Sequence, residues 1–101
     1  MNIAKMLKEA QRMQERMAEA QSELAARTIE ASSGGGKVKV TATGGGDITS
    51  IKIDPQVVDP QDVEFLEDLV LTAVKQAIED AKELAGAEMG KLTGGLKIPG
   101  L

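Results

Sequence analysis

Apolar and small side chains recur at alternating spacings of three and four residues between residues 2 and 26. That spacing places them on one stripe of an α-helix, and no Gly or Pro interrupts the segment. The pattern therefore predicts a long amphipathic helix that ends near residues 25–27. Its stripe consists of Ile3, Met6, Ala10, Met13, Met17, Ala20 and Leu24.

The middle of the chain changes to a period of two, which is typical of half-buried strands. Residues 27–31 form the first such segment, residues 37–43 the clearest, and residues 50–53 the third. Ile48 has the wrong parity for the third strand, so we expect a β-bulge there. Because Gly-rich turns separate the segments, they predict a three-stranded antiparallel meander.

A second helical stripe follows Asp59 and Pro60, which we interpret as an N-cap and a residue of the first turn. The stripe is wide, which indicates packing against more than one neighbour. It fails after Gly86, so we predict one domain over residues 1–88 and a loosely held, Gly-rich tail over residues 89–101. The stripe comprises Val63, Leu66, Val70, Ala73, Val74, Ala77, Ala81 and Leu84, flanked by Leu69, Leu71 and Ile78.

These elements define an α+β fold of the order α-β-β-β-α. A helix of about 25 residues spans roughly 37 Å, whereas a strand of about six residues spans about 20 Å. The start of the first helix and the end of the second should therefore project from the sheet as an arm. Apolar seams on such helices favour a symmetric dimer. Candidate positions for a dimer or core seam are Met6, Met13, Met17, Leu24, Leu71 and Ile78.

The composition narrows the chemistry. The 101 residues include one Phe and no Tyr or Trp, so the core is built from medium side chains and a second copy would help to close it. The chain has no His and no Cys, which removes imidazole and thiol chemistry, disulfides and the usual zinc ligand sets. We expect no catalytic residues, no metal and no cofactor, and an enzyme is the weakest of the functional classes.

Two motifs have competing interpretations. Asp54, Asp59 and Asp62 suit a metal site in principle, but a turn, a cap and a first-turn acid explain them better. The glycines at residues 34–36 lack the spacing of a phosphate-binding loop and lead into a strand, so loop conformation explains them.

Charge is distributed unevenly along the first helix. The net charge is −4, so binding to a polyanion requires a local concentration of cations. Cations recur along the first half of the helix, on a flank away from the apolar stripe, and Glu19 and Glu23 continue that flank. The alternative is a solvated face whose cations pair with neighbouring acids such as Glu9. The cations are Lys5, Lys8, Arg12 and Arg16.

The chain shows no secretory signal, and its longest apolar run, residues 69–71, is far too short to cross a bilayer. We therefore expect a cytoplasmic protein without a membrane partner.

Four segments in the same order resemble one known family: MLKEAQRMQERMAEAQSEL, GGGKVKVTATGGGDITSIKIDP, VEFLEDLVLTAVKQAIEDAKEL and MGKLTGGLKIPGL. The chain is similar to the YbaB/EbfC family of bacterial nucleoid-associated proteins. The resemblance implies a small homodimer whose protruding helices bind double-stranded DNA with weak sequence preference, at the nucleoid. It also implies DNA-binding residues on the first helix and in the distal tail: Lys5, Lys8, Arg12, Arg16, Lys91 and Lys97.

Two alternatives stay open. The acidic balance and the Met-rich seam also suit a protein-interaction scaffold that grips an unidentified protein partner, with DNA binding incidental. Lys37, Lys39 and Lys52 form a rival phosphate surface on the sheet, although protection against edge pairing explains them too. No aromatic side chain accompanies these lysines, which argues against binding of single strands.

Overall fold

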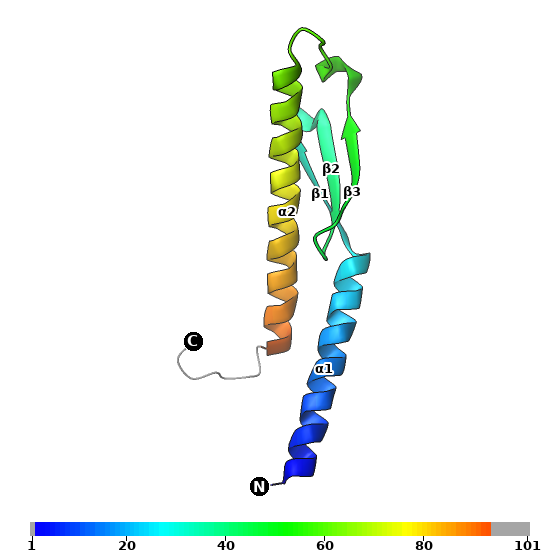
Figure 1. Ribbon diagram of the computed structural model, residues 1–101, viewed down its shortest axis with the longest axis vertical. Coiled ribbons are helices and arrows are strands. Elements are labelled where there is room, and N and C mark those ends of the chain that lie inside the picture. Colours follow the sequence, from blue (N-terminus) through cyan, green and yellow to red (C-terminus); the bar gives the residue numbers. More distant parts are fainter. Residues whose placement is uncertain (1, 94–101) are drawn as a thin grey trace, which may run out of the picture.

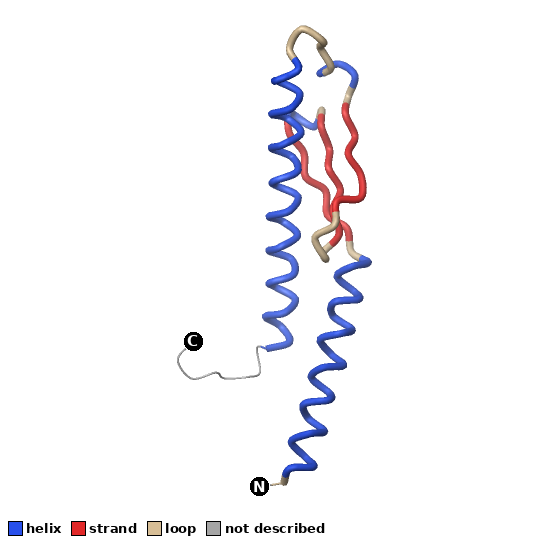
Figure 2. Tube along the Cα trace, in the orientation of Figure 1, coloured by secondary structure: helices blue, strands red, loops and turns tan. Residues whose placement is uncertain are grey.

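The protein is an elongated α-β-β-β-α molecule, which confirms the predicted fold class (Figures 1 and 2). The structure is a computed structural model that describes residues 2–93. Its principal extents are 71 × 28 × 16 Å. The elements are α1 (Ile3–Ala26), β1 (Thr28–Ser33), β2 (Val38–Thr43), β3 (Ile48–Ile53) and α2 (Val63–Thr93), with 3₁₀ turns at Gly34–Gly36 and Pro55–Val57.

The three strands form an antiparallel meander in the order β1-β2-β3. Between β2 and β3 the register shifts, because Thr41 pairs with Ser50 whereas Ala42 pairs with Ile48. The extra residue, Thr49, is the bulge that the parity of Ile48 predicts, and it returns Ile48 to the face of Val40. The turn between β1 and β2 requires glycine, since Gly35 has a φ of 67°.

The core lies between α2 and one face of the sheet. Val38, Val40 and Ala42 alternate along β2 and are fully buried beneath Ala73 and Ala77 of α2. Alanines on the helix allow its backbone to approach the sheet closely, so these medium side chains fill the space. The Ser33 hydroxyl donates a hydrogen bond of 2.6 Å to the carbonyl oxygen of Leu69, which fastens the end of β1 to the helix.

A single helix covers only part of this face. α2 packs closely on β1 and β2 and makes little contact with β3. Because a helix is about 10 Å wide and strands lie about 4.8 Å apart, one helix shields about two strands. Ile48, Ile51 and Ile53 share the face of the buried β2 residues, yet they stay exposed, Ile51 to 46%. The inward orientation of Ile51 and Ile53 is therefore right, but nothing within residues 2–93 covers them.

Both ends of α2 differ from the sequence-based expectation. The helix begins at Val63, and the carboxylate of Asp62 accepts a hydrogen bond from the Phe65 amide at 3.3 Å, as an N-cap does. Asp59 instead accepts from the Gln61 amide in the preceding turn, so the assignment of Asp59 as the cap was wrong. At its other end α2 continues through Gly86 to Thr93, because the helix-forming residues around that glycine offset its cost of about 1 kcal/mol.

The division into a domain of residues 1–88 and a tail of residues 89–101 stays a prediction. α2 crosses that boundary, and residues 94–101 lie outside the described part of the chain.

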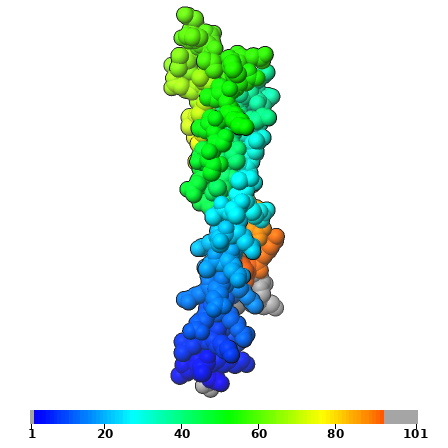
Figure 3. Space-filling model, turned by 90° about the vertical axis from the view of Figure 1, so that its right-hand side faces the viewer, coloured from blue at the N-terminus to red at the C-terminus, as the bar shows by residue number. Residues whose placement is uncertain are grey.

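The first part of α1 projects from the body by itself. α1 is held at its C-terminal end, where Leu24 is only 4% exposed and its carbonyl approaches Gly44. The last turns of α2 lie beside residues 16–23 of α1, with which they line a shared pocket. Beyond that level α1 continues alone (Figures 1 and 3). The end of α2 and the adjoining part of α1 therefore project from the sheet as a pair, as expected, and residues 3–17 of α1, which we call the arm, extend further as a single helix.

Candidate nucleic-acid interface

The cations of the first helix lie on one flank of the arm, which we call the basic flank: Lys5, Lys8, Arg12 and Arg16. All are exposed. Within residues 2–93 none of their side chains makes an ion pair, so the alternative in which these cations pair with neighbouring acids such as Glu9 is not what the structure shows. The first turn of α1 contains no acid. Their charge is therefore available to a ligand.

The N-terminal end of α1, which carries this charge, is stabilised by a capping side chain. The side-chain oxygen of Asn2 accepts a hydrogen bond of 3.2 Å from the Lys5 amide, which caps the first turn. The cap keeps the helix intact close to its N-terminus. Lys5 and Lys8 are consequently displayed from regular helix at the far end of the molecule.

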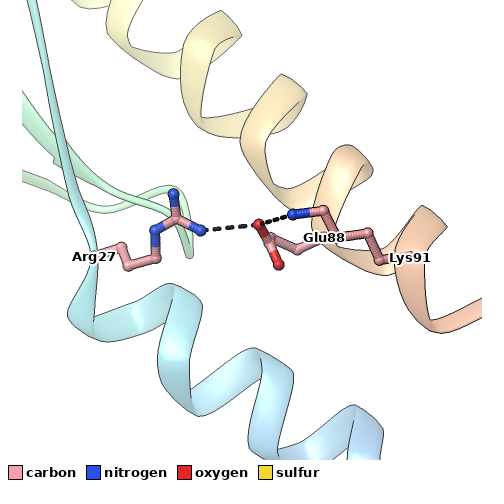
Figure 4. A network of polar contacts seen from close by, with 3 residues as sticks. All are labelled: Arg27, Glu88 and Lys91. Carbon is pink, nitrogen blue, oxygen red and sulfur yellow. Dashed lines mark hydrogen bonds and ion pairs between the residues drawn. The ribbon is translucent and has the colours of Figure 1, made fainter.

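A three-residue network at the C-terminal end of α1 joins the two helices (Figure 4). Arg27, which follows α1, donates to Glu88 of α2 at 2.9 Å, and Lys91 donates to the same oxygen at 3.3 Å. The hydrogen bond from Arg27, and next that from Lys91, lowers the pKa of Glu88 below its usual value. This network ties the C-terminal end of α1 to α2.

The two tail lysines differ from the basic flank. Lys91 is exposed but shares its charge with Glu88, so it is less available to an anion than Lys5 or Lys8. Lys97 lies outside the described residues. Their role in DNA binding stays a prediction that rests on the resemblance alone.

The rival lysines on the sheet are only partly engaged. Lys37 pairs with Asp54 at 3.4 Å and donates to Gln56 at 2.7 Å. The pKa of Asp54 is lowered, first by the Gln56 amide hydrogen bond and also by Lys37. Lys39 and Lys52 lie directly opposite each other in the register and are exposed. Two like charges in that position repel each other, so this surface offers less positive charge than the basic flank.

An open apolar groove of about 420 Å³, which we call the body groove, runs between β3 and α2. It is lined by Ile53, Leu66, Glu67, Val70, Leu71 and Val74. Leu71, a predicted seam residue, is 53% exposed here, whereas Leu24 is a core residue of its own chain. The periodic pattern of the strands did not predict the groove, because it shows which residues share a face but not whether that face is covered. The width of the second helical stripe was the signal that could have revealed it.

The acidic candidates have structural roles. Asp54 accepts from the Gln56 amide at 2.9 Å, and Asp59 and Asp62 accept from amides in the following turns. In the described part of the chain, no group of three or more Asp or Glu side chains is arranged to hold a metal ion. Over the same residues, no helix is both long and apolar enough to cross a membrane.

Together these features define a class: a small α+β protein that presents cations on a projecting helix. A family model described as the YbaB/EbfC DNA-binding family matches residues 1–96. A nucleoid-associated protein from Pelotomaculum thermopropionicum is 51% identical over 100 residues, covering 99% of this chain and 95% of the relative. Another from Thermoanaerobacter pseudethanolicus is 55% identical over 100 residues, covering 99% and 90%. The chain therefore belongs to the YbaB/EbfC DNA-binding family.

A solved structure supports the fold. The crystal structure of HP0035, an uncharacterized protein from Helicobacter pylori, matches with a TM-score of 0.83 over 93% of this chain and 99% of that one. Its sequence identity is 18%, so it shows the fold alone. The matching family is described as DNA-binding, and both relatives are named as nucleoid-associated proteins.

Proposed function

We propose that this protein is a homodimer that binds double-stranded DNA at the bacterial nucleoid, mainly through phosphate contacts from two arms. The observation that carries the proposal is the basic flank: exposed cations without ion pairs within residues 2–93, on a helix that projects from an acidic body. Membership of a DNA-binding family supports duplex DNA as the ligand.

The geometry of the basic flank suits contacts with the DNA backbone and not recognition of individual bases. Lys5 and Arg16 are separated by about 16 Å along the helix, a length over which a duplex presents several phosphates. Lysines and arginines on one flank of a helix can fix the position of the protein on the DNA backbone. Phosphate contacts of this kind carry no sequence information. Sequence preference then follows from duplex shape and deformability.

The body groove supports the dimer. Leu71 and Ile53 line the groove, Ile51 is exposed on the same sheet face as Ile53, and a second copy can cover this apolar surface symmetrically. Exposed apolar surface of this kind, next to a core with one Phe and no Tyr or Trp, marks an interface. Joining two bodies there provides two arms for one duplex, which raises affinity through effective concentration.

The test is a charge reversal with a matched control. In Lys5→Glu/Lys8→Glu/Arg12→Glu, we expect duplex affinity to collapse and its salt dependence to flatten. The control, Lys39→Glu/Lys52→Glu/Lys75→Glu, changes the net charge equally and includes the rival sheet surface, yet it should retain binding. Equal loss in both variants, or no loss in the first, would refute the basic flank as the site.

A protein-interaction scaffold is the second candidate, favoured by the same body groove, whose lining is almost entirely apolar. If the groove binds another protein, a partner captured by the wild type survives nuclease treatment and is lost in Leu71→Gln. If the groove joins two copies, Leu71→Gln instead lowers the molecular mass in solution.

A further inference from the structure

The arm carries a second surface that neither the basic flank nor the body groove uses. Ile3, Met6 and Met17 are 68%, 54% and 42% exposed, and α2 reaches only the level of residues 16–23. No other described segment covers them. We call the apolar positions Ile3, Met6, Ala10, Met13, Met17 and Ala20 the arm stripe; Ala20 lies just past the arm, where it is half-buried and lines the pocket that α1 shares with α2.

The spacing of the arm stripe is that of a coiled coil. Its residues alternate at three and four without exception, so Ile3, Ala10 and Met17 take one heptad position and Met6, Met13 and Ala20 the other. This narrow seam is the pattern by which one helix pairs with another, whereas a helix on a globular core shows a broader face, as α2 does.

We propose that the arm stripe binds the arm of a second copy as an antiparallel helix pair. In that register Ile3 meets Ala20 of the partner subunit, Met6 meets Met17 of the partner subunit, and Ala10 meets Met13 of the partner subunit. A small side chain thus opposes a large one in the Ile3 and Ala10 layers, and in the Met6 layer two flexible methionines oppose each other. The two-fold axis repeats each layer.

Charge complementarity selects the antiparallel orientation. Glu9 and Arg16 occupy the same heptad position beside the seam, and neither has an ion pair within residues 2–93. In the antiparallel pair Glu9 faces Arg16 of the partner subunit, and this contact occurs twice. A parallel pair would place Glu9 beside Gln14 of the partner subunit and Ala10 against Ala10, with no charge pair and a poorly filled layer.

The pairing leaves most of the basic flank free. Lys5, Lys8 and Arg12 lie on the outer side of the helix relative to the arm stripe, and only Arg16 borders the seam. An arm can therefore pair with another arm while its outer side contacts phosphate. Together with the body groove, this gives each chain two self-association surfaces, which link dimers into longer assemblies. Bridging of two duplexes follows, and that step rests on the proposed function.

The association is weak without DNA. The arm stripe spans about two and a half heptads, which is short for a stable helix pair in water. Binding to a common duplex raises the local concentration of arms and promotes pairing. Arm pairing therefore increases steeply with the density of protein on DNA.

Cross-linking tests the register directly, because the chain contains no Cys. We prepare Ala10→Cys and Met13→Cys as separate full-length proteins. A mixture of the two should form a disulfide-linked dimer roughly tenfold faster than either alone, since these positions face each other only in the antiparallel pair. Faster linkage of Ala10→Cys with itself, or a mixture no faster than Ala4→Cys alone on the outer side, would overturn the proposal.

A solution measurement separates this proposal from DNA binding. At a protein concentration high enough for the wild type to form species larger than its dimer, Met6→Gln/Met13→Gln, which keeps the charge and the helix, should lose the largest species seen in sedimentation. The control Ala4→Gln/Ser22→Gln, on the outer side of α1, should keep that species. If the Met variant sediments as the wild type does, arm pairing is wrong, whatever the DNA result.

DNA bridging is the final readout. The wild type should retain a labelled duplex on beads that carry a second duplex, and Met6→Gln/Met13→Gln should lose this retention while still binding a single short duplex. Failure of short-duplex binding in the wild type would instead refute the proposed function and leave the sedimentation result to decide arm pairing.

Discussion

The salt dependence of DNA binding is the most quantitative prediction. If each cation of the basic flank neutralises one phosphate, two arms neutralise about eight, and log K falls against log salt concentration with a slope of about −7. Between about 50 and about 200 mM salt, affinity should then fall by about 2 × 10⁴-fold. A dimer that uses fewer contacts gives a proportionally smaller slope, so the slope counts the contacts.

The informative substitution removes positive charge from the basic flank without introducing negative charge. Lys5→Gln/Lys8→Gln removes about four contacts per dimer, so the slope should fall to about −4 and the loss over the same salt range to about 150-fold. Both residues are exposed on a helix, and Gln is as good a helix former as Lys, so the fold is retained.

Fluorescence anisotropy of a short labelled duplex over a salt series measures both slopes. Lys75→Gln/Lys82→Gln, at exposed positions of α2, is the matched control with the same change in net charge. It should keep the slope of the wild type. A double variant of the arm whose slope equals that of the control shows that phosphate contacts come from elsewhere, and the reasoning from the basic flank then fails.

Three further predictions follow from the packing. Leu71→Gln should roughly halve the mass in solution at moderate concentration by placing an amide in the body groove, as light scattering would show; an unchanged mass moves the dimer interface elsewhere. Because the folded pKa of Glu88 is lowered, its stabilising contacts are present above the ordinary Glu pKa and lost as pH falls through the lowered value, so Glu88→Gln should flatten the acid dependence of thermal unfolding. Gly44→Ala should destabilise the C-terminal end of α1 by about 1–3 kcal/mol, since an added Cβ would lie 2.7 Å from the Leu24 carbonyl oxygen; Gly45→Ala, where the nearest atom is at 3.5 Å, is the control in urea unfolding.

The periodic patterns predicted the local structure well because they depend on neighbours in the chain. The end of α1, the alternation along β2 and the bulge at Ile48 all follow from spacing that a short window contains. The N-cap of α2 was misplaced at Asp59 because Asp59 and Asp62 both offer a capping carboxylate. Only the path of the preceding turn decides which one reaches the first free amides.

The candidate site was predictable in part. The basic flank could be read from intervals in the sequence, and the resemblance indicated its ligand. The sequence did not show that the cations of the basic flank are free of ion pairs. Lys5 and Glu9 have the correct helical spacing for an ion pair, yet the structure does not form it. Likewise, the sequence contains Arg27 and Glu88 but no signal that they meet, since they are far apart in the chain and come together only when α1 docks beside α2.

By itself, the sequence determined which side chains share a face: the apolar and basic sides of α1, the alternation of β2 and the small residues of α2. It did so because helix and strand periods are properties of the local backbone. Tertiary structure alone decided which of those faces is covered. α2 lies over β1 and β2, buries Val40 and leaves Ile51 and Leu71 exposed, and it ends before the arm does. Whether a face is covered depends on how helices and strands of different length and width pack against one another, and that packing is a property of the whole chain.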